Sequence, residues 1–409
     1  MYKEITKCRI SESSNLITVL SLGNQYLTGV FLKTKEEEVT NGPLDVVWCP
    51  DSGLLQMKQT YSLKEMYGNN YGYRSGLNTS MVKHLQQKIR TLESLVELNK
   101  NDLVIDIGSN DATSLKAYSG VHKKIGIDPT GNKFKDYYTE DITLIPDFFT
   151  TEIFEKYFPD EKAKIITSIA MFYDLESPLD FVENIEQCLA EDGIWHFEQS
   201  YMPNMLKANS YDTICHEHLE FYSLKVVKNM LEKFGLRIID VQLNAINGGS
   251  FAVTACNKKA KYVSNQPVID RLLIQEDEMG LDTLKPYREF EDRVIKHRIN
   301  LIELIDTLVT DGKKIFGYGA STKGNVLLQY CNLTSNQIPY IAELNEEKFG
   351  TFTPGTLIPI ISETEAKAMN PDYLLVLPWH FKNNILARER EYLAKGGKFI
   401  FPLPEIEII

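Results

Sequence analysis

The sequence predicts an α/β fold in three parts, with a small N-terminal unit followed by two units built on mostly parallel sheets. Three observations support this prediction. The chain has 409 residues, more than a single hydrophobic core usually organises. Short apolar strands alternate with helical segments over most of the chain, as in sheets covered by helices on both faces. Two of these strands end in glycine and lead into a helix. We place the units at residues 1–76, 77–256 and 257–409.

Composition and charge exclude several classes of protein. The 43% hydrophobic and 24% charged content is typical of a globular protein. A formal net charge of -12 leaves no basic surplus to neutralise phosphates, which argues against a nucleic acid partner. No apolar run is long enough to span a membrane, and the first residues lack the apolar segment of a signal peptide. Because six scattered cysteines do not form a disulfide framework, we expect a cytoplasmic protein. We also expect it to be a monomer or a small homo-oligomer.

The N-terminal unit contains strand-like runs at 15–20 and 44–49 and ends in a tyrosine-rich stretch. Aromatic side chains beside glycines can form a lid over a ligand, and they can equally pack between domains. In the lid interpretation, Tyr73 contacts a cofactor and Tyr71 contacts the substrate. The sequence leaves both alternatives open.

The central unit begins with an amphipathic helix and continues into a strand over 102–108. Gly108 lets the backbone turn close to a ligand, and Ser109 and Asn110 follow it in the loop. About twenty residues later, Asp128 ends the next strand, where a carboxylate can accept hydrogen bonds from ribose hydroxyls. This spacing predicts a pocket for a nucleoside cofactor.

The identity of that cofactor follows from charge. The loop lacks the GxGxxG fingerprint of dinucleotide sites. Asp106 and Asp111 would repel a pyrophosphate but would attract the ammonium group of a methionine moiety. Asp147 and Phe148 follow the third strand, a position suited to a base-edge acceptor and an aromatic contact. The central unit is therefore predicted to be a class I, Rossmann-like domain that binds S-adenosylmethionine (SAM).

The C-terminal unit contains a second glycine loop with the opposite charge. Gly319 lies in a turn that exposes backbone N–H groups, Ser321 and Thr322 add hydroxyl donors, and Lys323 adds a positive charge at a helix N-terminus. This combination suits a diphosphate and predicts a Rossmann-like unit that binds the substrate. The alternative is a tight strand-helix turn with an exposed lysine.

The segment 210–223 concentrates titratable groups, because two of the seven histidines, His216 and His218, flank Glu217. Titratable side chains beside a cofactor fold indicate proton transfer, and histidine exchanges a proton near neutral pH. The alternative is that both histidines are hydrogen-bonded core residues.

With both loops and this segment, the chain resembles the sugar C-methyltransferases of deoxysugar biosynthesis, in particular those that methylate C-3 of nucleotide-linked 4-ketosugars. The motifs that carry the resemblance are the runs 106–111, 216–219, 247–250 and 317–324. The resemblance implies a zinc-binding N-terminal unit, a central SAM domain and a Rossmann-like C-terminal unit. It also implies a nucleotide-linked sugar as substrate, contacted by Asn247, Gly249 and Ser250.

The chain departs from this family at the zinc ligands. The family's two Cys-x-x-Cys pairs read here as Cys8-Arg-Ile-Ser11 and Cys49-Pro-Asp-Ser52. Neutral serine is a poor substitute for a zinc-bound thiolate, so we expect neither zinc nor another metal. A Cys8–Cys49 disulfide is not expected in a reducing cytoplasm. Cys215 and the loop 169–174 also differ from the family, which leaves the exact substrate open.

The resemblance implies a mechanism in which a base removes the proton α to a sugar ketone and the enolate carbon accepts the methyl group. We assign the base to His218, its orientation to Glu217, and the hydrogen bond to the enolate oxygen to His216 or Tyr222.

Three alternatives to carbon methylation remain at this point. Methyl transfer to a sugar oxygen or nitrogen also needs a base. An NAD-dependent oxidoreductase using the second glycine loop is disfavoured, because only Glu343 follows that loop at a suitable distance. A SAM-binding interaction protein would leave the His-Glu-His segment without a role.

Overall fold

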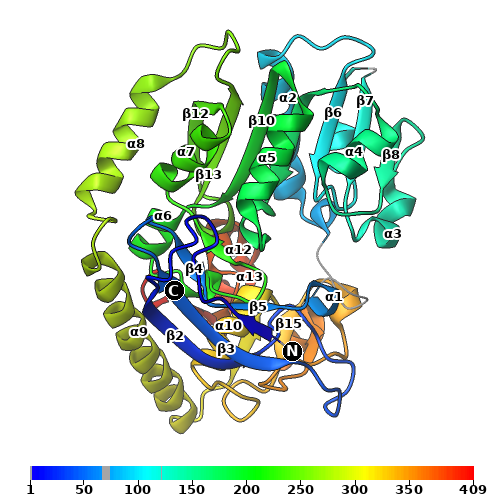
Figure 1. Cartoon of the computed structure of the whole chain (residues 1–409). Helices are drawn as coiled ribbons and strands as arrows, with labels where there is room; N and C mark the ends of the chain where they lie inside the picture. The colour runs from blue at the N-terminus through cyan, green and yellow to red at the C-terminus, as the bar shows by residue number, and fades with distance from the viewer. Residues whose placement is uncertain (1, 67–73, 121) are drawn as a thin grey trace.

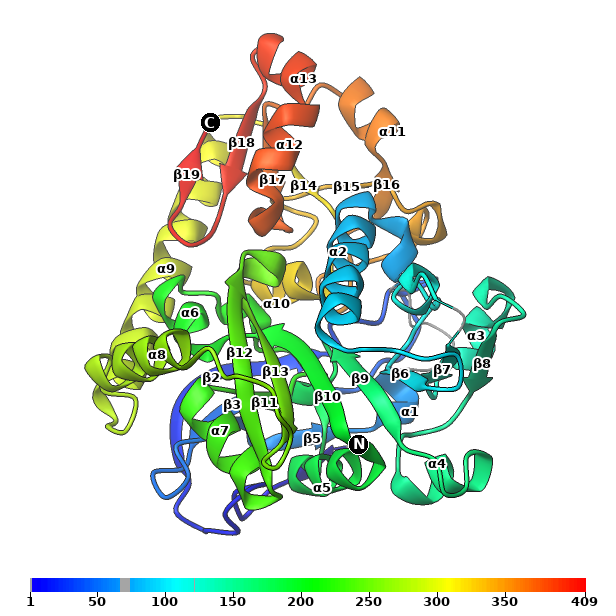
Figure 2. The ribbon, with the colours of Figure 1, turned by 90° about the horizontal axis from the view of Figure 1, so that it is seen from above.

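The computed structural model describes residues 2–66, 74–120 and 122–409. It confirms the predicted three-part α/β architecture, with one larger sheet in each unit and a two-stranded ribbon beside the N-terminal sheet (Figure 1). The seven-stranded sheet of the central unit occupies the upper part of Figure 1, and the N-terminal and C-terminal units lie below it. Figure 2 shows the same ribbon from above.

The N-terminal unit is an antiparallel sheet in the order β11-β4-β3-β2. Three of its strands come from the first sixty residues, namely β2 (Ile17–Tyr26), β3 (Asn41–Trp48) and β4 (Leu55–Met57). The fourth, β11 (Glu220–Phe221), begins two residues after His218 and pairs with β4. A separate ribbon joins β1 (Tyr2–Glu4) to β5 (Gln59–Tyr61), and the short helix α1 spans Leu63–Met66.

The central sheet has the order β12-β13-β10-β9-β6-β7-β8, with all strands parallel except β13. Its strands are β6 (Leu103–Ile107), β7 (Lys123–Ile127), β8 (Ile142–Ile145), β9 (Ala163–Ile169), β10 (Leu189–Ser200), β12 (Leu236–Asn244) and β13 (Ser250–Asn257). The helices are α2 (Thr79–Leu95), α3 (Gly131–Phe134), α4 (Thr151–Tyr157), α5 (Pro178–Cys188), α6 (Met202–Lys207), α7 (Leu224–Lys233) and α8 (Gln266–Glu278). Successive parallel strands run outward in both directions from β6, so the strand order switches between β6 and β9.

Helices cover both faces of this sheet because its strands are apolar on both sides. On one face, Ile89 and Leu92 of α2 pack with Val104, Ile165 and Ile194. On the other, a cluster shared by the sheet, α5, α7 and α8 contains Trp195, Phe181, Val227 and Leu272. The Asn78 side chain caps α2 by accepting from the backbone N–H of Ser80 at 2.9 Å.

The C-terminal sheet has the order β16-β15-β14-β17-β18-β19 and is parallel except at β19. Its strands are β14 (Ile315–Tyr318), β15 (Ile341–Glu343), β16 (Ile360–Ser362), β17 (Tyr373–Val376), β18 (Lys398–Phe401) and β19 (Glu407–Ile408). The helices are α9 (Lys285–Thr310), α10 (Thr322–Tyr330), α11 (Glu363–Ala368), α12 (Lys382–Arg388) and α13 (Arg390–Ala394). Here the strand order switches between β14 and β17, the place where open α/β sheets bind ligands.

The N-terminal and C-terminal units share one hydrophobic cluster that includes Val46, Trp48, Val326 and Leu328. Two side-chain amides reinforce this contact, because Asn325 donates to the backbone oxygen of Thr28 at 2.8 Å and Gln329 exchanges hydrogen bonds with the backbone of Tyr26. The N-terminal and C-terminal units therefore pack together through one shared core, and the central sheet lies above them in Figure 1.

The predicted boundaries at 76/77 and 256/257 stay predictions. The helix α8 follows residue 257 and yet packs on α7 and β12 of the central sheet, and β11 lies inside the central range and yet joins the N-terminal sheet. Within the ranges 2–66, 74–120 and 122–409, no helix is long and apolar enough to cross a membrane.

Candidate active site

The loop after β6 has the geometry of a ligand-binding turn. Gly108 has a φ of 70°, a left-handed conformation that favours glycine, and Asn110 and Ala112 follow with positive φ. A Cβ at Gly108 would approach Met171, which follows β9, to 3.2 Å. The loop therefore sits at the switch point between β6 and β9.

Asp128 stabilises this loop from the end of β7. Its Oδ2 accepts from the backbone N–H of Asn110 at 2.7 Å, and its Oδ1 accepts from the backbone and hydroxyl of Thr130, both at 2.6 Å. The Ser109 hydroxyl hydrogen-bonds to the Tyr138 hydroxyl at 2.7 Å. A carboxylate has about four acceptor sites, so Asp128 retains capacity for ribose hydroxyls. The loop and this carboxylate fit the nucleoside part of SAM.

The other predicted cofactor residues differ in accessibility. Asp106 is buried and accepts from Thr167 at 2.5 Å, and burial raises its pKa to about 7. Asp111 accepts from the backbone of Gly76 at 2.9 Å. Asp147 is exposed and Phe148 is 53% exposed at the end of β8. Tyr71 and Tyr73 lie outside the described residues.

His218 has a defined tautomer. Its Nδ1 lies 2.7 Å from the backbone oxygen of Thr213, and because a carbonyl only accepts, Nδ1 carries the proton. Nε2 is therefore the basic nitrogen. Burial, and to a smaller extent the positive charge of Lys323, lowers the pKa of His218 to about 3. The imidazole is consequently neutral at physiological pH, as a proton acceptor must be.

Tyr173 packs against His218 at the carboxyl end of β9. The Tyr173 and His218 rings have centroids 4.2 Å apart, and the backbone oxygen of Tyr173 accepts from Leu219 at 2.7 Å. Tyr173 follows β9, two residues after Met171, which lies against Gly108. The histidine thus lies beside the carboxyl end of β9.

His216 and Tyr222 occupy different environments from His218. His216 is fully buried, donates from Nε2 to the Gln25 oxygen at 3.2 Å and accepts at Nδ1 from Thr28 at 3.4 Å. Tyr222 is also fully buried, and its ring stacks on Phe172 at 5.1 Å. The His216 side chain therefore joins the segment to the N-terminal unit, whereas Tyr222 packs inside the central unit.

The Glu217 carboxylate lies against Gly29 of the N-terminal unit. A Cβ at Gly29 would collide with Glu217 Oε1 and would lie 3.6 Å from the Thr322 hydroxyl. Burial raises the pKa of Glu217. The group that orients His218 is the backbone oxygen of Thr213, which sequence reasoning missed because a main-chain acceptor has no residue signature.

Lys323 lies close enough to His218 for its charge to lower the pKa of the histidine. Lys323 is near the start of α10, and its Nζ donates to the Asn247 oxygen at 2.6 Å. Burial lowers the pKa of Lys323, and the carboxylate of Asp212 opposes this shift. Asp212 is itself buried and accepts from the indole of Trp379 at 2.8 Å.

The loop 247–250 completes this arrangement. A Cβ at Gly248 would approach the Trp379 ring to 3.3 Å, and one at Gly249 would approach Asn204 to 3.0 Å. Ser250 begins β13 and donates to the Ile246 oxygen at 2.9 Å. Of the predicted substrate residues, Asn247 therefore touches Lys323 directly, whereas Ser250 is buried behind the loop.

The second glycine loop is held by Glu343 at the end of β15. The carboxylate accepts from the backbone N–H of Ala320 at 2.7 Å, and Lys348 donates to the Ala320 oxygen at 2.7 Å. Ser321 caps α10 by accepting from Gly324 at 3.0 Å. A Cβ at Gly319 would collide with the ring of Pro378, which follows β17. This loop therefore lies at the switch point of the C-terminal sheet.

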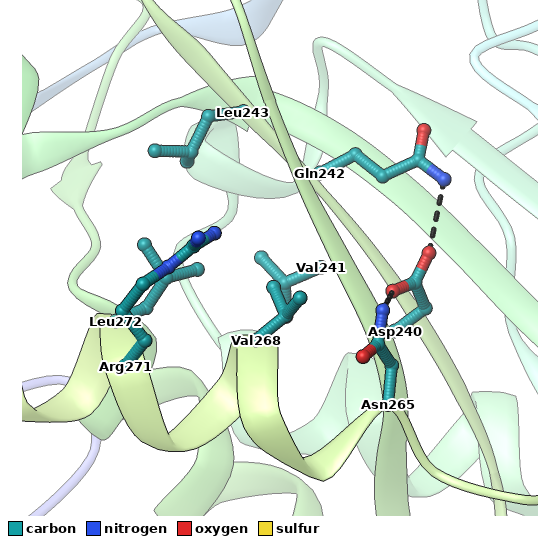
Figure 3. Close-up of a pocket in the computed structure, with 8 residues that line it drawn as sticks. All are labelled: Asp240, Val241, Gln242, Leu243, Asn265, Val268, Arg271 and Leu272. Atoms are coloured by element: carbon teal, nitrogen blue, oxygen red, sulfur yellow. Dashed lines mark hydrogen bonds between the residues drawn. The ribbon is translucent and has the colours of Figure 1, made fainter.

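A cavity of about 510 Å³ lies elsewhere, between β12 and α8 (Figure 3). Figure 3 shows Val268, Arg271 and Leu272 of α8 on one side of this cavity and Val241 and Leu243 of β12 on the other. Asp240 bonds Gln242 and Asn265 at its rim. None of its eight lining residues is a predicted site residue, so the cavity does not bear on the chemistry above.

The N-terminal unit does not offer a zinc ligand set. No group of three or more His, Cys, Asp or Glu side chains in the described part of the chain is placed to hold a metal ion. Two thiols, Cys8 and Cys49, are accompanied by the hydroxyls of Ser11 and Ser52, a combination that does not fit structural zinc. The absence of zinc stays a prediction.

Three family models match consecutive parts of the chain. The model described as "Putative zinc binding domain" matches residues 8–67, a methyltransferase domain matches 81–241, and a C-methyltransferase C-terminal domain matches 245–404. The C-methyltransferase NovU of Streptomyces niveus is 31% identical over 411 residues, which cover 100% of this chain and 97% of NovU.

Two similar solved structures each align with less than half of the chain. One comes from the complex of the Haloferax volcanii Trm112 methyltransferase activator with a methyltransferase, at TM-score 0.36 and 13% identity, covering 44% of this chain and 94% of that chain. Another is a SAM-dependent methyltransferase from Clostridium acetobutylicum ATCC 824, at TM-score 0.34 and 11% identity, covering 43% and 92%.

The fold and the matched methyltransferase domain define the chain as a SAM-dependent methyltransferase. Its full-length likeness to NovU places it in a narrower class: the chain belongs to the C-methyltransferase family. Carbon is therefore the methyl acceptor of this family, in preference to oxygen or nitrogen, and an oxidoreductase is not supported.

Proposed function

We propose that this C-methyltransferase acts on a nucleotide-linked ketosugar and that His218 removes the proton α to the ketone. The observation that carries this proposal is the hydrogen bond from His218 Nδ1 to the Thr213 oxygen at 2.7 Å, which leaves Nε2 as the base. A carbon next to a ketone needs such a base, because only the deprotonated carbon is nucleophilic. SAM held by the loop after β6 and by Asp128 supplies an electrophilic methyl group.

Proton removal breaks the C–H bond, gives the proton to His218 Nε2 and moves the electron pair toward the ketone oxygen. We assign the stabilisation of that oxygen to Lys323, because its positive charge acts on His218 and its Nζ is held by Asn247 at 2.6 Å. A cation near a developing oxyanion is effective in a site that excludes water. His216 and Tyr222 are less suited, since both side chains are fully buried.

The diphosphate of the substrate is assigned to the second glycine loop. Ser321 and Thr322 lie at the N-terminus of α10, and Lys348 lies beside Ala320. The carboxylate of Glu343 already bonds this loop, as Asp128 bonds the loop after β6. By that analogy, we assign to Glu343 the contact with the nucleoside ribose of the substrate.

The test is solvent exchange at the carbon that becomes methylated. A nucleotide-linked 4-ketosugar is incubated with the enzyme in deuterated water, with and without SAM, and the position of deuterium and methyl is read by NMR. Wild type should incorporate deuterium at the α-carbon. His218→Asn should lose exchange and methylation by roughly 10²- to 10⁴-fold, the usual contribution of a positioned base.

A matched control is His122→Asn, because His122 lies directly before β7 and its Nδ1 bonds the backbone oxygen of Asn99, which precedes β6, so it belongs to neither of the proposed groups around His218. This variant should keep both activities. Full exchange by His218→Asn would reject His218 as the base, and no exchange or methylation with any nucleotide-linked ketosugar would reject the substrate class.

A further inference from the structure

Two turns in the N-terminal unit have the same conformation. In the first, Cys8 N–H donates to the Ser13 oxygen at 2.8 Å and the Cys8 oxygen accepts from Glu12 at 3.0 Å. In the second, Cys49 N–H donates to the Leu54 oxygen at 3.0 Å and the Cys49 oxygen accepts from Gly53 at 2.8 Å. The spacing of each hydrogen bond along the chain is identical in the two turns.

The two turns also agree in one backbone angle and in the hydrogen bond that each serine accepts. The fifth residue of each turn has positive φ, 58° at Glu12 and 75° at Gly53. The serine three residues after each cysteine accepts from the backbone two residues further on, Ser11 from Ser13 at 3.4 Å and Ser52 from Leu54 at 3.2 Å. Glu12 is not glycine and still adopts the left-handed conformation, so the turn is held by its surroundings.

The side chains of the two turns pair crosswise. Cys8 Sγ lies 3.3 Å from Ser52 Oγ, and Ser11 Oγ lies 3.5 Å from Cys49 Sγ. Both thiols are fully buried, whereas Ser11 lies at the surface. The Ser13 hydroxyl adds a hydrogen bond to Asp51 at 2.5 Å across the same junction.

We propose that Cys8, Ser11, Cys49 and Ser52 form a metal-free tie, in which two crossed thiol–hydroxyl hydrogen bonds hold the turns where a metal-binding homologue would use an ion. Each turn supplies one sulfur and one oxygen, and each sulfur meets the oxygen of the other turn. The arrangement brings two sulfurs and two oxygens together in two close pairs, without the charge of a thiolate set. Two substitutions should therefore create a tetrahedral thiolate site.

The tie supports the segment that contains His218. Arg9, next to Cys8, forms a buried ion pair with Glu220 at 3.5 Å and donates to the Met57 oxygen at 2.7 Å. Met57 N–H donates in turn to the Leu219 oxygen at 2.8 Å. The two turns therefore fix the strand β4 that pairs with β11, directly after His218.

The experiment measures metal content and thermal unfolding of the full chain. Wild type, purified with added zinc and then freed of loose metal by gel filtration, should carry no stoichiometric zinc. Ser11→Cys/Ser52→Cys should carry about one zinc ion per chain, and a chelator should lower its Tm. Wild-type Tm should not respond to the chelator.

The control variant is Ser14→Cys/Ser21→Cys, which adds two thiols at exposed positions of the same unit, outside the tie. It should bind no stoichiometric zinc. If the double variant of the tie fails to fold, Ser11→Cys and Ser52→Cys alone, with three thiols each, should retain zinc more weakly. A folded tie variant without zinc would overturn the proposal, as would stoichiometric zinc in wild type.

Discussion

Lys323 donates from Nζ to the backbone oxygen of Asn247 at 2.6 Å, and this bond joins α10 of the C-terminal unit to the loop before β13 of the central sheet. The two residues come from the two separate motifs predicted to contact substrate. Their contact places a cation of the C-terminal unit within electrostatic reach of His218. It also links the position of that cation to the conformation of the loop 247–250.

The first prediction separates two roles for Lys323. If Lys323 stabilises the developing enolate oxygen, Lys323→Met should lower deuterium exchange at saturating ketosugar by roughly 10²- to 10³-fold, as loss of an oxyanion donor does. If it only binds diphosphate, KM should rise while saturated exchange is unchanged. Exchange measured against substrate concentration decides between them, and S-adenosylhomocysteine affinity should be unchanged in either case.

The second prediction concerns pH. Burial and the charge of Lys323 lower the pKa of His218 to about 3, so the base stays unprotonated and exchange should not fall as pH decreases through the ordinary histidine value of about 6.5. On the alkaline side, exchange should fall as Lys323 loses its proton below the ordinary lysine value, because burial lowers its pKa.

Two Lys323 variants test this assignment. Lys323→Arg should move the alkaline limb upward, since arginine stays charged. Lys323→Met should move the acidic limb upward, since it removes a charge that lowers the His218 pKa. If the pH–rate profiles of wild type and both variants were the same, the protonation of His218 and Lys323 would not control the exchange rate.

The strands and both glycine loops could be predicted from sequence because each leaves a local pattern. An apolar run that ends in glycine and is followed by a helix is visible in the residues around Gly108 and Gly319. Asp128 was also predictable, because its distance from Gly108 fixes it at the end of the next strand. These features depend on neighbours in the chain.

The parts that could not be predicted depend on contacts distant in sequence. The strand β11 is two residues long and pairs with β4, which lies more than 160 residues earlier, so it has no periodicity of its own. The orientation of His218 comes from the backbone of Thr213. The adjacent histidine, His216, has the same residue type but bonds Gln25 and Thr28 instead. Residue type alone therefore did not distinguish the two.

The third prediction concerns the cofactor. Asp128→Asn should weaken binding of S-adenosylhomocysteine by roughly 10- to 100-fold, because it removes the charge that holds the Asn110 backbone and that we propose to hold the ribose hydroxyls. Calorimetry measures the change, with Asp136→Asn as the control, since Asp136 is exposed in the neighbouring turn. Unchanged affinity in Asp128→Asn would place the ribose elsewhere.

The fourth prediction concerns a buried charge cluster under the loop 247–250. Glu198 on β10 bonds His84 at 2.6 Å, Lys88 at 2.7 Å and the Asn244 amide at 2.8 Å. Asn244 accepts in turn from Ile246 at 2.9 Å, immediately before Asn247. Burial alone would raise the pKa of Glu198, but its hydrogen bond to His84 and the charge of Lys88 outweigh burial and lower the pKa to about 2.

Because the folded pKa of Glu198 lies below its unfolded value, its contribution to stability is complete above about pH 4.5 and should be lost as pH falls toward 2. Glu198→Gln should lower the free energy of unfolding at neutral pH by about 3–5 kcal/mol, since it leaves Lys88 buried without a counter-charge. Urea unfolding measures this loss. Glu198→Gln/Lys88→Met should recover part of it, because the double variant removes both charges. If the single variant were as stable as wild type from pH 7 to pH 4, the ion pair between Glu198 and Lys88 would contribute nothing to the stability of the fold.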